Sequence, residues 1–143
     1  MDQNIAVREI GLEMHSDILR LSKILNPKIE ETLLAPRINK MFNYVNYFSF
    51  GVFKDNVLVG ISGGWVTDRL YSGKQLEVDH FILDPDFRSL GIGTILLHYI
   101  ETWAKNQECI TLELNAYVGN SRGHKFYFQN GYKILGFHFQ KNL

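Results

Sequence analysis

The sequence contains little cysteine, little proline and no excess of charge of either sign. Of its 143 residues, one is cysteine and three are proline. A single cysteine, Cys109, excludes a disulfide framework and suits a reducing compartment. It directly precedes an apolar-alternating run, so we interpret it as a buried thiol. Because no repeat, low-complexity tract or proline-rich stretch marks a linker, we expect one domain over residues 1–143.

The charges of the chain balance. Fifteen Lys and Arg residues stand against fifteen Asp and Glu residues, which gives a formal net charge of zero. No global field would attract nucleic acid or an anionic membrane, so we expect neither as a partner. No uncharged apolar run is long enough to span a bilayer, and the polar residues 1–4 lack the features of a signal peptide. These observations predict a cytoplasmic protein.

The apolar pattern predicts an α+β fold with helices on the faces of a sheet. Strands are expected at residues 5–10, 47–54, 57–66, 74–83, 110–116 and 132–139. Helices are expected from Ser16 and Asp17, which can cap the first one, from Pro27, from Gly91 and at residues 121–130. Pro36 should end or kink the second helix. Asp55-Asn56 tolerates positive φ and predicts a tight hairpin.

A candidate phosphate-binding loop follows the strand at residues 74–83. It is the segment Arg88-Ser89-Leu90-Gly91-Ile92-Gly93-Thr94, which leads into an amphipathic helix. Backbone N–H groups and the positive end of a helix favour phosphate at such a place. Glycine lets the pyrophosphate approach the backbone closely. The dinucleotide fingerprint would need a small residue at Leu96, and the P-loop would need Lys at Thr94; an ordinary helix-start turn is the other interpretation.

The loop and a second motif resemble the GNAT superfamily, the Gcn5-related N-acetyltransferases. Residues 88–93 are similar to the Q/R-x-x-G-x-G/A acetyl-CoA motif, and Leu83-Asp84-Pro85 is similar to the V-x-P that commonly precedes it. The second motif, N-x-x-A-x-x-x-Y-x-x-x-G-F, is matched in spacing by Asn120, Tyr127, Gly131 and Tyr132. The chain departs from the family pattern at Ser89, Leu90 and Gly123.

This resemblance implies the GNAT fold, with a mixed, mostly antiparallel central sheet flanked by helices. It implies an acetyl-CoA-dependent N-acetyltransferase that transfers acetyl directly to an amine of a small molecule or of a protein or peptide. It also implies acetyl-CoA as donor, no metal, and a possible homodimer, since dimers are common among relatives. The alternatives are a non-catalytic acyl-CoA-binding or sensing module and a donor with an acyl group longer than acetyl.

The resemblance also implies roles for individual residues. Backbone groups of Phe81 and Leu83 would bind the acetyl carbonyl and the pantetheine arm, and the N–H groups of residues 88–94 would hold the pyrophosphate. Asn120 would bond the pantetheine arm. Tyr127 would be the general acid at the thioester sulfur, because a phenol with an ordinary pKa near 10 is protonated at pH 7. Packing within an aromatic run is the alternative for Tyr127.

Glu77 is the candidate general base. Strand alternation puts Glu77, Asp79, Phe81 and Leu83 on one face, provided that no bulge lies between them. A solvated face or a structural ion pair is the alternative for these carboxylates. With Glu113 on the neighbouring strand they predict an acidic cleft, a cationic or polar amine acceptor, and a carboxylate pKa raised by crowding.

Other side chains are interpreted more simply. His80 reads as a packed or surface histidine, and no set of His, Cys and carboxylate residues has metal-ligand spacing. An aromatic group falls where relatives build the wall of the acceptor site, and plain core is an equal interpretation. That group comprises Phe42, Tyr44, Tyr47 and Phe48.

Overall fold

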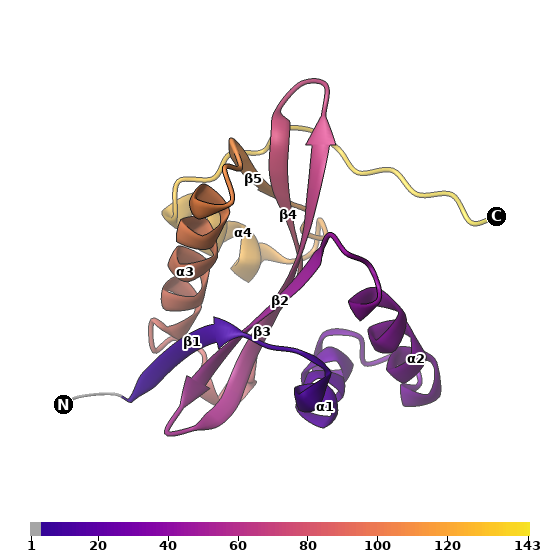
Figure 1. Cartoon of the computed structure of the whole chain (residues 1–143), viewed down its shortest axis with the longest axis vertical. Coiled ribbons are helices and arrows are strands. Elements are labelled where there is room, and N and C mark those ends of the chain that lie inside the picture. Colours follow the sequence, from indigo (N-terminus) through magenta and orange to yellow (C-terminus); the bar gives the residue numbers. More distant parts are fainter. Residues whose placement is uncertain (1–3) are drawn as a thin grey trace. The chain divides into compact units, whose positions relative to one another are not determined.

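The computed structural model describes residues 4–143 (Figure 1). Residues 1–3, which form most of the polar start considered above, lie outside the described residues. The chain divides into two compact units, a first that ends at Glu113 and a second, Leu114–Leu143. The expectation of one domain therefore stays a prediction.

A five-stranded sheet organises the first unit, with the order β1-β2-β3-β4-β5. Its strands are β1 (Ile5–Glu9), β2 (Tyr47–Lys54), β3 (Val57–Arg69), β4 (Gly73–Leu83) and β5 (Thr111–Leu114). The first four pair antiparallel. The N–H of Ile110 donates to the carbonyl of Lys74 at 2.7 Å. The beginnings of β5 and β4 therefore lie side by side, β5 runs parallel to β4, and the predicted mixed, mostly antiparallel sheet is confirmed.

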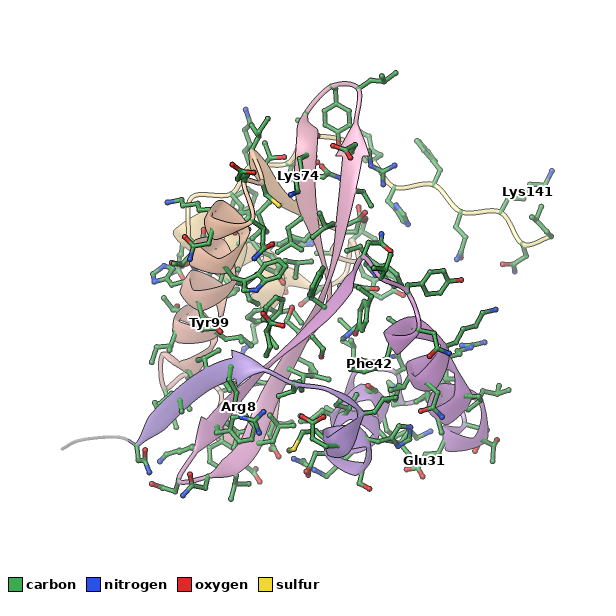
Figure 2. The ribbon with its side chains drawn as sticks, in the orientation of Figure 1. Arg8, Glu31, Phe42, Lys74, Tyr99 and Lys141 are labelled. Carbon is green, nitrogen blue, oxygen red and sulfur yellow. The ribbon has the colours of Figure 1, made fainter. Side chains whose placement is uncertain are left out.

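Helices cover both faces of this sheet. On one face α1 (His15–Leu25) and α2 (Glu31–Phe42) pack on a buried cluster that includes Leu21, Ile38 and Ile61. On the other face α3 (Ile92–Asn106) places Trp103 against Phe50, with ring centroids 5.1 Å apart. Figure 2 shows the two sides, with α2 and α3 on opposite faces. Both faces of β2 and β3 are consequently buried.

Local sequence signals were correct at the first hairpin and wrong at the starts of α1 and α2, and α2 begins at Glu31 rather than at Pro27. Asp55 and Asn56 have φ values of 49° and 66°, as the tight turn requires. The first helix begins at His15, so Ser16 and Asp17 lie inside its first turn and do not cap it. Pro36 lies inside α2 and does not end it. Burial of Leu34 and Ile38 on either side offsets the lost N–H.

The second unit contains one helix, α4 (Ser121–Gln129), among its described residues. The expected strand at residues 132–139 is wrong as an element of the single chain, because residues 132–143 belong to no helix or strand. The strand expected at 110–116 is shortened to β5. Within residues 4–143, no helix is both long and apolar enough to cross a membrane.

Candidate active site

A bulge in β4 shapes the region that carries the candidate base. Gly63 of β3 pairs with Asp79, whereas Ile61 pairs with Ile82. One residue of β3 therefore faces the two residues of β4 between Asp79 and Ile82. The first of these, His80, has a φ of +39°, the left-handed conformation that an inserted residue adopts where a strand bends.

The bulge changes which side chains share a face. The expectation that Glu77, Asp79, Phe81 and Leu83 project together is wrong past Asp79. Residues that pair directly across two strands project from the same face. On β3, Glu77 pairs with Trp65 and Asp79 pairs with Gly63, so their partners are two residues apart. Leu83 pairs with Gly60, which is three residues from Gly63. Glu77 and Asp79 therefore share the α1–α2 face, and Leu83 projects from the other.

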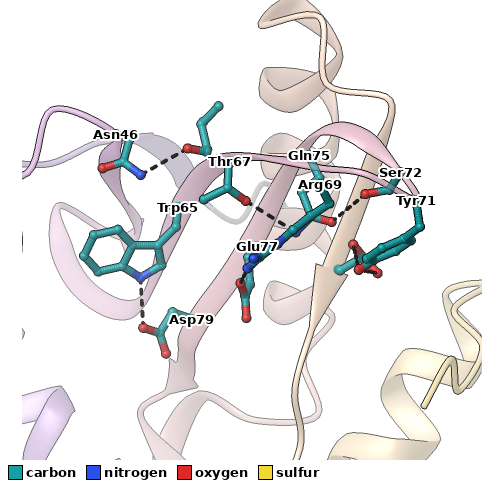
Figure 3. Close-up of polar contacts among 11 residues, drawn as sticks. Asn46, Trp65, Thr67, Arg69, Tyr71, Ser72, Gln75, Glu77 and Asp79 are labelled. Atoms are coloured by element: carbon teal, nitrogen blue, oxygen red, sulfur yellow. Dashed lines mark hydrogen bonds and ion pairs between the residues drawn. The ribbon is translucent and has the colours of Figure 1, made fainter. Parts of the chain in front are cut away.

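Four side chains form a hydrogen-bonded cluster on this face: Tyr47, Trp65, Asp79 and His80. The Tyr47 hydroxyl lies 2.9 Å from His80 Nε2. Trp65 Nε1 donates to Asp79 Oδ2 at 3.1 Å (Figure 3). The backbone N–H of His80 donates to Asp79 Oδ1 at 2.9 Å, and His80 Nδ1 lies 3.7 Å from Asp79 Oδ2. The Asp79 carboxylate thus contacts both the backbone and the ring of the bulge residue.

The cluster shifts two pKa values in opposite directions. The His80 side chain beside it lowers the pKa of Asp79 from 3.8 to about 2, and the Trp65 N–H adds to this effect. Burial raises the pKa of the Tyr47 phenol above its ordinary value. Tyr47 therefore keeps its proton at neutral pH and can donate it to His80 Nε2, which leaves the ring proton on Nδ1 facing Asp79. Asp79 is therefore not the carboxylate whose pKa is raised by crowding, and the expected rise stays a prediction.

Gly63 makes room for this cluster. A Cβ at position 63 would overlap the His80 ring and lie 2.7 Å from the Tyr47 hydroxyl oxygen. We predict that Gly63→Ala lowers the free energy of unfolding by about 1–3 kcal/mol, the cost of overpacking a buried site. Urea unfolding measures this loss. Gly119→Ala is the control, because its Cβ would meet nothing within 4 Å. Equal stability of the two variants would show that the ring moves aside without cost.

The lowered pKa of Asp79 predicts how stability depends on pH. A carboxyl whose pKa is lower in the folded chain stabilises the fold above its ordinary pKa, and this contribution is lost as pH falls toward the folded value. Between pH 4 and pH 2, the wild type should therefore lose roughly 1 kcal/mol more than Asp79→Asn, a figure reduced for solvent screening because the side chain is half exposed. Urea unfolding across this range tests it; parallel curves would contradict it.

The other two carboxylates contact different partners. Glu77 Oε2 lies 3.4 Å from Arg69 Nη2 (Figure 3). The Tyr71 hydroxyl lies 2.8 Å from both carboxylate oxygens of Glu113, and this hydrogen bond raises the pKa of Tyr71. Glu77 is thus paired with a residue of its own hairpin, and Glu113 of β5 is paired with Tyr71 in the turn of that hairpin. The acidic cleft stays a prediction.

The expected aromatic group is divided between the two faces. Tyr47 contacts Phe42 and Trp65, with ring centroids 5.2 and 4.7 Å apart, and Tyr44 contacts Trp65 at 5.6 Å. Phe48 lies on the opposite face against Trp103. The group is therefore no single wall. Trp65 and the pairing of Tyr47 with His80 were missed, because a contact between residues far apart in sequence leaves no local pattern.

The expected phosphate loop lies between β4 and α3 and is anchored at its start. Asp84 Oδ1 accepts from the Asp86 N–H at 3.1 Å, and Arg20 of α1 donates to Asp84 Oδ2 at 2.8 Å. Ser89 and Gly91 have φ values of +65° and +79°. Gly91 is the N-cap of α3, and no side chain caps this helix. The Ile95 N–H donates to the Gly91 carbonyl at 3.2 Å.

This geometry suits a diphosphate. The N–H groups of the first turn of α3 have no partner inside the helix, and they point with the helix dipole. A Cβ at Gly91 would meet nothing within 4 Å, so the space beside the cap is open in the described structure. Gly93 is buried within the first turn, and Leu90 is exposed.

In the second unit, Asn120 caps α4. Its Oδ1 accepts from the Gly123 N–H at 3.0 Å. A Cβ at position 123 would lie 2.8 Å from Asn120 Cγ. Glycine in place of the alanine typical of the motif therefore leaves room for the cap.

The end of the same helix explains the rest of the second motif. Gly131 has a φ of +86°, its N–H donates to Phe128 O at 3.1 Å, and the Tyr132 N–H donates to Tyr127 O at 3.0 Å. These two bonds define a Schellman motif, and the rings of Tyr127 and Tyr132 lie 5.9 Å apart. Burial raises the pKa of Tyr127 to about 12, so its phenol stays protonated at neutral pH.

Within residues 4–143, no group of three or more His, Cys, Asp or Glu side chains is arranged to hold a metal ion.

Comparison with known proteins finds relatives that are acetyltransferases by name. A sequence model of the acetyltransferase (GNAT) family matches residues 16–132. An N-acetyltransferase of Bacillus subtilis, YhdJ, named as uncharacterized, is 23% identical over 112 residues, which cover 78% of each chain. The aminoglycoside N-acetyltransferase AAC(6')-Iy, solved in complex with CoA, has a TM-score of 0.88 at 15% identity, covering 100% of this chain and 97% of that one. A GNAT acetyltransferase of Staphylococcus aureus has a TM-score of 0.79 at 25% identity, covering 97% and 98%.

Proposed function

This chain belongs to the acetyltransferase (GNAT) family, and we propose that it transfers the acetyl group of acetyl-CoA directly to an amine of a cationic or polar acceptor. The observation that carries the choice of acceptor is the pair of carboxylates, Glu77 and Asp79, on one face of β4 directly before the bulge. No feature of the described residues favours the alternative of a non-catalytic acyl-CoA-binding module. Since the family model crosses both units, we propose one catalytic domain, and we propose a cytoplasmic location.

The donor would be held mainly by backbone groups. When bound, acetyl-CoA supplies the acetyl group. We assign the pyrophosphate to backbone groups of residues 88–94, above all to the N–H groups of the first turn of α3, which have no partner inside the helix; the Arg88 N–H donates to Pro85 O at 3.4 Å and would have to be shared. We assign the acetyl carbonyl and the pantetheine arm to backbone groups of Phe81 and Leu83. The Asn120 Oδ1 caps α4, so its Nδ2 is the atom that we assign to the pantetheine arm.

A base near the bulge would accept the proton of the amine. Glu77 is our first candidate, and its ion pair with Arg69 would have to open or share the carboxylate. Asp79 is a poor base, because its pKa is about 2. His80 is the second candidate, since a neutral imidazole can accept a proton and this ring is positioned by Tyr47 and Asp79.

An acetylation assay tests the proposed function. Release of the free thiol from acetyl-CoA would be measured over aminoglycosides, polyamines, peptides and neutral amines, with butyryl-CoA as a second donor. Cationic amines should give the highest kcat/KM. Gly93→Val is the loss-of-donor variant, because side-chain atoms added in the first turn of α3 would crowd a pyrophosphate. Gly93 is buried, so urea unfolding first establishes that the variant folds. No thiol release with any amine, together with no binding of acetyl-CoA by calorimetry, would overturn the proposal.

Glu77→Gln removes the charge of the side chain and keeps its shape, and we predict that it impairs catalysis. If Glu77 is the base, kcat/KM for cationic amines should fall by roughly 10²-fold, and the acid limb of the pH–rate profile should flatten. His80→Asn is the comparison, and Glu113→Gln tests the carboxylate on β5, which is the base if only that variant removes the acid limb. If only His80→Asn removes the acid limb, the base is His80. Unchanged profiles in both variants would remove both candidates.

We predict that Tyr127→Phe lowers kcat by roughly 10²- to 10⁴-fold, because the proton donor for the departing thiolate is lost. The affinity for acetyl-CoA should change little. Tyr132→Phe is the control: it keeps a ring at the helix end and removes a hydroxyl to which we assign no chemistry. Pre-steady-state kinetics would separate the chemical step from binding. Equal kcat in wild type and Tyr127→Phe would limit Tyr127 to packing.

A further inference from the structure

Arg20 of α1 joins three parts of the fold that are distant in sequence. Its Nη1 donates to Asp84 Oδ2 at 2.8 Å, and its Nη2 donates to the carbonyl of Leu58 in β3 at 3.1 Å. A guanidinium can bind both because its N–H groups point in fixed, separate directions. The Asp84 side chain is only 17% exposed, so water screens this ion pair less than one on the open surface. One side chain therefore connects the first helix, an interior strand and the residue that follows β4.

Asp84 in turn organises the start of the candidate phosphate loop. Its N–H donates to the Val59 carbonyl at 2.8 Å, and its own carbonyl accepts from the Phe87 N–H at 2.9 Å. Its Oδ1 accepts from the Asp86 N–H at 3.1 Å, so one carboxylate oxygen holds the short 3-10 turn while the other binds the guanidinium. A shift of Asp84 would move this turn, and with it residues 88–94, which follow the turn directly.

The loop needs an anchor because part of its backbone is unfavourable in itself. Ser89 has a φ of +65°, in the left-handed region that is costly for a residue with a Cβ. Glycine would adopt this conformation freely. The cap of α3, Gly91, stands only two residues further on. Contacts with the rest of the fold must therefore offset the cost at Ser89, and the ion pair of Asp84 with Arg20 is one of them.

We propose that Arg20 is a positioning residue for the donor: by holding Asp84, it keeps the loop in the conformation that binds the pyrophosphate of acetyl-CoA. This role rests on the proposed function, which assigns that pyrophosphate to residues 88–94. A donor that meets N–H groups already in place has less ordering to pay for, so its affinity depends on the anchor. Since α1 packs on the face toward which Glu77 and Asp79 project, Arg20 also links the acceptor side of the sheet to the donor loop.

The first test measures the affinity for acetyl-CoA by calorimetry. Arg20→Met keeps an unbranched side chain and removes the guanidinium, and it should raise the Kd by roughly tenfold, the effect of losing a hydrogen bond between charged groups. The KM for acetyl-CoA should rise with it, whereas kcat at saturating acetyl-CoA should stay within about twofold, since no reacting group is removed. Arg20→Lys should recover part of the affinity, because an ammonium can still pair with Asp84. Arg37→Met is the matched control, because it removes the same charge from an exposed position on α2.

Binding by the wild type separates a failure of this role from a failure of the proposed function. If the wild type does not bind acetyl-CoA, both fail. If the wild type binds and Arg20→Met binds as tightly, the positioning role is overturned and the proposed function stands. In a double-mutant cycle, Asp84→Asn keeps the acceptor for the Asp86 N–H, and its loss of affinity should not add to that of Arg20→Met, because the two side chains act as a unit. Additive losses would contradict a shared action.

Hydrogen exchange without ligand distinguishes positioning from a general loss of stability. In Arg20→Met, the N–H groups of Asp84, Asp86 and Phe87 should exchange roughly tenfold faster than in the wild type, because the hydrogen bonds that protect them depend on the anchored Asp84. The N–H groups of β2 should be accelerated much less. Equal acceleration in β2 and in the turn would mean that Arg20 stabilises the whole fold, and the positioning role would be overturned.

Discussion

The inserted residue in β4 is the constraint on which the candidate site depends. Because His80 is an additional residue in the strand, Glu77 and Asp79 project toward α1 and α2 while Leu83 projects toward α3. A regular strand would have put all three on one face. The bulge is held by contacts with β2 and β3: the Tyr47 hydroxyl binds the His80 ring, and Gly63 leaves space for it. The carboxylate beside it, Asp79, contacts the backbone and the ring together.

Features that follow local rules could be predicted from the sequence. The Asp55-Asn56 hairpin needs positive φ at two residues, and the side chains of Asp and Asn tolerate it. The start of α3 at Gly91 follows from a glycine before an apolar helical period. Gly131 was matched to a motif, and the structure explains it as a helix stop in the left-handed conformation. In each case a few neighbouring residues contain the whole cause.

Features that depend on two distant segments could not be predicted. A bulge is a property of register between two strands, and β4 alone contains no sign that one of its residues is unpaired. The pKa of Asp79 falls because the His80 and Trp65 side chains are near in space, and neither contact leaves a sign in the sequence around Asp79. Pro36 was expected to end or kink a helix, yet α2 continues through it. The burial of Leu34 and Ile38 stabilises this helix, and helix propensity does not include such packing.

The strand expected at the end of the chain differs from these failures. Its sequence alternates apolar and other residues as a strand does, yet residues 132–143 belong to no helix or strand. What local sequence does determine at this end of the chain is the turn before it. Gly131 takes the left-handed conformation, and the Tyr132 N–H closes the Schellman motif onto Tyr127 O. The glycine of the second motif therefore ends the helix that carries the proposed acid.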